Sequence, residues 1–74
     1  MSERGAAVIR VTANGKPFEV RGDTTVAGFI RQRGLDPQFV LVEYNGEPLE
    51  RARYADAQLK DGDRLELVRP VAGG

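Results

Sequence analysis

The chain has 74 residues, the length of one small domain, and its eleven basic and eleven acidic side chains give a net charge of zero. Without a basic surplus, binding to the phosphate backbone of a nucleic acid is disfavoured. The lack of cysteine and histidine removes disulfides, the usual zinc sites and catalysis by Ser-His-Asp or Cys-His groups, so we expect neither an independent enzyme nor a metal site.

Residues 1–7 resemble a loose leader and lack the apolar run of a signal peptide. No stretch of the sequence is long and apolar enough to span a membrane. We therefore expect no membrane partner and, by elimination, a cytoplasmic location. Three parts are expected along the chain: a disordered leader at 1–7, a folded domain at 8–69 and a flexible C-terminal tail at 70–74.

Two segments of alternating apolar and polar residues, 8–13 and 16–20, flank the dipeptide Asn14-Gly15. Asn-Gly favours a type I′ turn, in which both central residues have positive φ, so the pattern predicts a β-hairpin. In this register the expected cross-strand pairs are Ile9 with Val20, Arg10 with Glu19, and Val11 with Phe18. Pro17 lacks an amide donor, which indicates that the second segment is an edge strand or that Pro17 occupies a non-bonded slot.

The stretch 26–33 and the residues that flank it predict a helix of about ten residues, because the apolar side chains at 26, 29 and 30 lie on one helical face. Thr24 or Thr25 can cap its start, and Gly34 suits the position just after its end. Leu35 is then expected to fold back onto the helix.

The second half of the chain predicts three further strands, at 39–44, 47–49 and 64–68. In the first of these, alternation directs the even-numbered residues inward and Leu41 and Glu43 outward. Asn45-Gly46 predicts a second tight turn into the short strand. Four aromatic side chains are expected in the core or at its rim: Phe18, Phe29, Phe39 and Tyr54.

One helix packed across one face of a mixed sheet is the simplest arrangement that buries these apolar sets. The last strand is distant in sequence from the first hairpin but carries a similar set of inward residues. We therefore expect it in the centre of the sheet, parallel to the first strand. This is an α+β arrangement of the β-grasp, or ubiquitin-like, type.

The strand-like pattern ends after Val68, because Pro70 cannot donate to a strand ladder. The four residues that follow, Val71-Ala72-Gly73-Gly74, span about 13 Å when fully extended. Gly73 and Gly74 place a carboxylate on a segment without side chains near its tip, which can enter a tunnel that any Cβ atom would block. We therefore predict that this tail reaches into the active site of another protein.

Three stretches of the chain together resemble the ThiS family, the sulfur carriers of thiamine thiazole synthesis. They are Val42 to Glu47, Leu59 to Val68, and the terminal Gly73-Gly74. The resemblance covers residues 8–74. The combination of turn, strand and Gly-Gly terminus is more specific than any one of these features.

The resemblance implies a carrier on which other proteins act and which has no catalytic residue of its own. A ThiF or E1-like adenylyltransferase binds the folded domain and uses MgATP to convert the Gly74 carboxylate into an acyl-adenylate. A persulfide sulfur displaces AMP and leaves a Gly74 thiocarboxylate, from which thiazole synthase takes the sulfur. Val71, Ala72 and Gly73 would give Gly74 access to the active site.

Other functions share part of this pattern. The tail from Pro70 to Gly74 is also similar to that of the small subunit of molybdopterin synthase. A carrier for another sulfur pathway and a ubiquitin-like protein modifier are further alternatives.

Partner docking is expected near the end of the last strand. Leu41 and Val68 can form a small apolar patch on the outer face of the sheet. Glu43 occupies an outward position where ubiquitin-like proteins often place an apolar residue, so a wholly apolar docking face is not expected. Arg69 can steer an acidic partner surface towards the tail.

Overall fold

The computed structural model of the protein describes residues 7–70, and residues 1–6 and 71–74 lie outside the described part. In chain order its elements are β1 (Val8–Ala13), β2 (Lys16–Arg21), α1 (Val26–Gln32), η2 (Pro37–Phe39), β3 (Leu41–Tyr44), β4 (Glu47–Leu49), η3 (Arg51–Arg53) and β5 (Arg64–Val68). The elements labelled η are single turns of 3-10 helix. The expected hairpin, helix and later strands are therefore confirmed, with different bounds for the helix and for β3.

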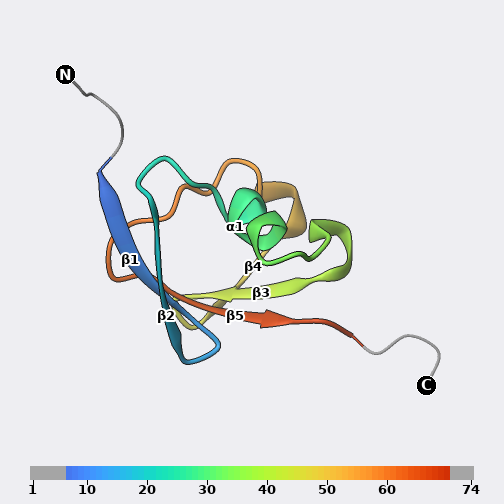
Figure 1. Cartoon of the computed structure of the whole chain (residues 1–74). Coiled ribbons are helices and arrows are strands. Elements are labelled where there is room, and N and C mark those ends of the chain that lie inside the picture. The colour runs from blue at the N-terminus through green and yellow to red at the C-terminus, as the bar shows by residue number, and fades with distance from the viewer. Residues whose placement is uncertain (1–6, 71–74) are drawn as a thin grey trace.

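Within the described residues, five strands form one mixed sheet in the order β2-β1-β5-β3-β4. The last strand, β5, lies in the centre, parallel to β1 and antiparallel to β3. Helix α1 and the two η turns lie on the same side of this sheet (Figure 1). The predicted β-grasp fold and the central placement of the last strand are confirmed.

The β1–β2 hairpin has the register expected from the sequence. The observed pairs include Ile9 with Val20, Arg10 with Glu19, and Val11 with Phe18. Asn14 and Gly15 have φ angles of 51° and 81°, as a type I′ turn requires. On the outer face, Arg10 and Glu19 form an exposed ion pair of 3.2 Å, and β2 is an edge strand that tolerates Pro17.

Helix α1 is held by a cap at each end. The Thr25 hydroxyl accepts a hydrogen bond of 3.1 Å from the Gly28 amide at its start. At its end, Gly34 has φ 79° and its amide donates to the Arg31 carbonyl at 2.9 Å. The Leu35 amide donates to the Ile30 carbonyl at 3.1 Å, and these two bonds together form a Schellman motif. These caps confine the helix to seven residues instead of about ten, and the second cap returns Leu35 to the core as expected.

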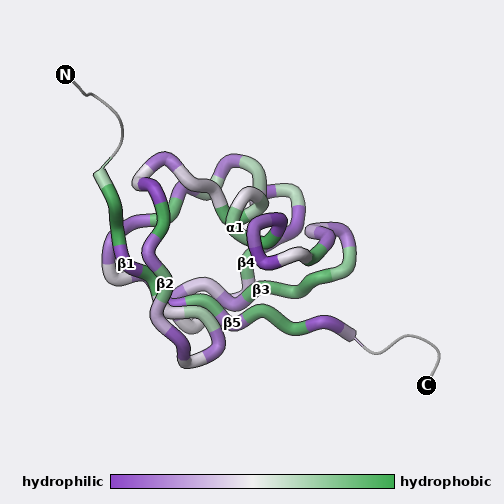
Figure 2. Tube along the Cα trace, viewed as in Figure 1, coloured by the Kyte–Doolittle hydropathy of each residue, from purple (hydrophilic) through white to green (hydrophobic). Residues whose placement is uncertain are grey.

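The hydrophobic core lies between α1 and the inner face of the sheet. Its largest fully buried side chains are Val11, Val26, Phe29, Ile30, Val40 and Leu59. The Phe18 and Phe29 rings meet edge to face with centroids 5.5 Å apart, and the Tyr54 hydroxyl donates to the Val40 carbonyl at 2.9 Å. Figure 2 shows hydrophobic stretches along β1, β3 and β5, and their buried residues Val11, Val42 and Leu65 belong to this core.

Phe39 corrects one of the sequence predictions, because 68% of its surface is exposed. It ends the η2 turn, whose start is capped by the Asp36 side chain, and β3 begins only at Leu41. Val40 is fully buried and sets the alternation, so Phe39 and Leu41 both point away from the core. Phe39 is therefore not a core anchor.

A buried carboxylate connects the β3–β4 turn to the start of β5. Asp63, which is 7% exposed, accepts hydrogen bonds from the Lys60 amide at 2.7 Å, the Asn45 side chain at 3.2 Å and the Tyr44 hydroxyl. Asn45 in turn accepts from the Arg64 amide at 2.9 Å. Burial raises the pKa of Tyr44 to about 12, with further contributions from the hydrogen bond to Asp63 and from its charge.

The raised pKa of Tyr44 makes folding stability depend on pH in the alkaline range. An unfolded tyrosine loses its proton near pH 10, whereas folded Tyr44 keeps it up to about pH 12. The stabilisation is therefore complete below pH 10 and is lost as the pH rises through 12. Ultraviolet titration should resolve a late tyrosinate signal, and denaturant midpoints should fall over this range. Tyr44→Phe should remove the late signal. If all tyrosinate absorbance of the wild-type protein appeared near pH 10, the raised pKa of Tyr44 would be contradicted.

Candidate functional site

The candidate site is the place where β5 leaves the sheet. The predicted tail residues Val71 to Gly74 lie outside the described residues, so their role stays a prediction. The described residues that precede them, Val68, Arg69 and Pro70, are all exposed. Among residues 7–70 there is no group of three or more potential metal ligands, and no helix there has the length and apolar character to cross a membrane.

Both neighbours of β5 hold the strand up to this exit. On one side β3 pairs with it antiparallel, with Val42 opposite Leu67 and Leu41 opposite Val68. On the other side β1 ends at Ala13, where the backbone ladder would stop. The side chain of the next residue, Asn14, continues it.

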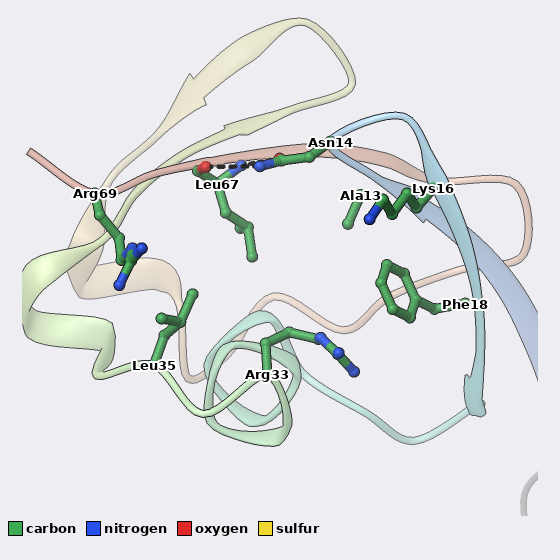
Figure 3. A pocket seen from close by; sticks show the side chains of 8 residues that line it. All are labelled: Ala13, Asn14, Lys16, Phe18, Arg33, Leu35, Leu67 and Arg69. Carbon is green, nitrogen blue, oxygen red and sulfur yellow. Dashed lines mark hydrogen bonds between the residues drawn. The ribbon is translucent and has the colours of Figure 1, made fainter.

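Asn14 binds both backbone groups of Leu67. Its Oδ1 accepts from the Leu67 amide at 2.7 Å, and its Nδ2 donates to the Leu67 carbonyl at 3.0 Å (Figure 3). The backbone amide of Asn14 also donates to the Leu65 carbonyl at 2.9 Å. The side-chain amide thus takes the place of a further peptide unit of β1. The sequence pattern indicated only a turn at Asn14, because nothing local shows that β5 lies beside it.

The structure brings together three of the four predicted docking residues. Leu41 and Val68 are cross-strand partners, each 50% exposed on the outer face of the sheet. Glu43 lies beside them, opposite Pro48 on β4 and Glu66 on β5. Residues of these strands line a shallow hollow of about 260 Å³. The outer face near the exit is therefore apolar at Leu41 and Val68 and acidic further along the strands.

Arg69, the fourth predicted docking residue, lies on the other side of the sheet. Strand alternation places it on the same side as Leu67, so its side chain points towards Leu35 at the end of the helix (Figure 3). The two faces beside the exit therefore present different chemistry to a partner.

Comparison with known proteins assigns a family to this architecture. Residues 10–74 match the model of the ThiS family. The sulfur carrier protein ThiS of Bacillus subtilis (strain 168) is 36% identical over 62 residues, which cover 82% of this chain and 94% of that protein. A crystal structure of the thiamine biosynthesis protein ThiS from Geobacter metallireducens superposes with a TM-score of 0.75 at 33% identity, covering 89% of this chain and all of that one.

A longer protein also contains a related stretch. The thiazole synthase of Paramagnetospirillum magneticum (strain ATCC 700264 / AMB-1) is 32% identical over 66 residues, or 89% of this chain. The chain spans only 20% of the length of that protein.

The contact between Asn14 and β5 can be tested with Asn14→Gly, which keeps the positive φ of the turn but removes both hydrogen bonds to Leu67. The free energy of unfolding should fall by about 1–2 kcal/mol. The Leu67 amide should exchange faster with deuterium in the folded protein, as measured by NMR. Asn14→Asp retains the acceptor and should have a smaller effect on both quantities. Unchanged exchange at Leu67 in Asn14→Gly would contradict this role.

Proposed function

The chain belongs to the ThiS family, and from this premise we propose that it is the sulfur carrier of thiamine thiazole synthesis, with the sulfur carried on the Gly74 carboxyl group. The observation that supports this most is the family match, which extends through β5 to residue 74. The similarity to proteins named ThiS from Bacillus subtilis and Geobacter metallireducens favours this function over the small subunit of molybdopterin synthase. The folded domain is then the part that partners bind, and the chemistry takes place in their active sites. The cytoplasmic location stays a prediction.

In the proposed reaction, an adenylyltransferase of the ThiF type binds the folded domain and uses MgATP as its co-substrate. The Gly74 carboxylate attacks the α-phosphorus, pyrophosphate leaves, and an acyl-adenylate forms. A persulfide then displaces AMP to give an acyl disulfide, and a second thiol cleaves its S–S bond to release the thiocarboxylate. A carboxylate is a poor electrophile, so activation must precede sulfur transfer, and a partner's active site positions the reacting groups.

The chain contributes position and access to this reaction. β5 is bound on one side by β3 and on the other by Asn14, so the tail starts from a defined point. From Pro70 the four remaining residues can reach about 13 Å. Gly73 and Gly74 have no Cβ atom that would block a narrow passage.

Thiazole synthase is the proposed recipient of the sulfur. The Paramagnetospirillum protein of that name contains a stretch similar to nearly the whole of this chain, within a much longer sequence. Joining a carrier and its recipient in one polypeptide raises their effective concentration, which supports a functional pairing of the two proteins.

The proposed carrier role predicts a defined mass change. With a ThiF-type enzyme, ATP and a persulfide donor, the chain should gain the mass difference between one sulfur and one oxygen atom, and tandem mass spectrometry should locate it at Gly74. An alanine added after Gly74, or Gly73→Val, should abolish the change. Both variants should unfold at the wild-type temperature, because the buried core lies within residues 11–65. An unmodified wild-type chain beside an active partner would refute the proposal.

The outer face at the exit is the proposed docking surface for the adenylyltransferase. Leu41→Ala and Val68→Ala should each raise the KM for the carrier by about 5- to 30-fold without changing kcat, because each removes apolar contact area of a partner interface. Val8→Ala is the matched control: Val8 is 65% exposed on the same face but at the far end of β1. Equal KM values for all three variants would exclude the patch as a docking surface.

A further inference from the structure

A second hollow lies on the helix side of the sheet, beside the exit of β5. It has a volume of about 350 Å³, and three parts of the chain that are distant in sequence form its walls. The residues that matter for its chemistry are Lys16 and Phe18 from the hairpin, Arg33 and Leu35 from the end of the helix, and Leu67 and Arg69 from the end of β5 (Figure 3).

The floor of this hollow is apolar because of the helix cap and the strand alternation. The Schellman motif at Gly34 directs Leu35 back towards the sheet, where Phe18 and Leu67 face it. All three side chains are partly exposed. An apolar side chain from another molecule can therefore bury surface here.

The rim of the hollow is cationic. Arg33 lies over the Phe18 ring, 4.4 Å from its centroid, and Lys16 and Arg69 are exposed on either side. No acidic residue among the described ones lines the hollow, although the whole chain is neutral. The ion pairs found among residues 7–70 join Arg10 to Glu19 and Arg21 to Asp23, away from this site.

We propose that this hollow binds an acidic segment of the adenylyltransferase, with an apolar side chain on the floor and carboxylates against the rim. The inference rests on the proposed function, because it requires such an enzyme to receive the tail. Arg69 directly precedes Pro70, so this rim lies next to the start of the tail that such an enzyme would take up. Complementary charge here increases the rate of encounter and orients the carrier.

A protein segment fits this site better than a small free anion does. The three cations are exposed, and an isolated ion pair at an exposed position contributes at most about 1 kcal/mol. A segment that also covers Phe18, Leu35 and Leu67 gains apolar burial in addition to its charge contacts. The volume of the hollow suits one or two side chains.

The test compares charge reversals of matched lysines. Lys16→Glu should raise the KM of the adenylyltransferase for the carrier by about 3- to 10-fold, leave kcat unchanged, and reduce the salt dependence of kcat/KM. Lys60→Glu makes the same charge change at an exposed position outside the hollow, and its KM should stay within about twofold of wild type. A second pair of variants removes a charge without reversing it: Arg33→Gln changes the rim, and Arg53→Gln changes an exposed arginine outside the hollow. The KM should again rise only for the variant at the rim.

An NMR titration shows which face is covered. Addition of unlabelled adenylyltransferase should broaden the amide signals of Phe18, Arg33 and Leu35 more than those of Arg53 and Asp56. ATP or inorganic phosphate alone should leave these signals unshifted. If phosphate alone perturbed the amide signals of Phe18, Arg33 and Leu35 as strongly as the enzyme does, the hollow would be a small-anion site and the proposal would be overturned.

The outcomes separate this inference from the proposed function. If wild-type carrier is not adenylated at all, both fall. If it is adenylated and Lys16→Glu matches Lys60→Glu in KM and salt dependence, the hollow is not a docking site, while the carrier function stands.

Discussion

The hydrogen bonding of β5 on both of its edges is the constraint on which the functional part of this molecule depends. The strand pairs with β1 on one side and with β3 on the other. Asn14 extends the first pairing to Leu67, and Asn45 binds the backbone of Arg64 at the opposite end. A central strand cannot shift without breaking both ladders, so the chain leaves the domain at a fixed place and in a fixed direction.

This central placement also determines the two surfaces beside the exit. Side chains alternate along a strand, so Val68 lies on the outer face and Arg69 on the helix side. The outer face combines Leu41 and Val68 with nearby carboxylates, whereas the inner hollow combines an apolar floor with cations. A partner that contacts both faces would bind this domain in a single orientation, because neither surface can substitute for the other.

Under the proposed function, the folded domain and its partners contribute different things to the reaction. It has neither cysteine nor histidine, and its buried carboxylate, Asp63, is occupied by hydrogen bonds that join turns to strands. The folded domain thus supplies shape, charge and a starting point for the tail. In the proposed reaction, the partner enzymes activate the carboxylate and transfer the sulfur.

Local sequence patterns were sufficient to predict most of the architecture. Asn-Gly and two-residue alternation determine the hairpin register, and Thr25 and Gly34 mark the helix ends, because each of these signals acts over only a few residues. The expectation of Phe39 in the core or at its rim follows from its aromatic side chain, whereas the alternation that buries Val40 directs Phe39 away from the core. Leu41, Glu43 and Val68 were placed correctly by alternation alone. The role of Asn14 at Leu67 and the meeting of Lys16, Arg33 and Arg69 were decided only by the tertiary structure. These residues come from segments far apart in the chain, and it is the packing of helix and strands around β5 that brings them together.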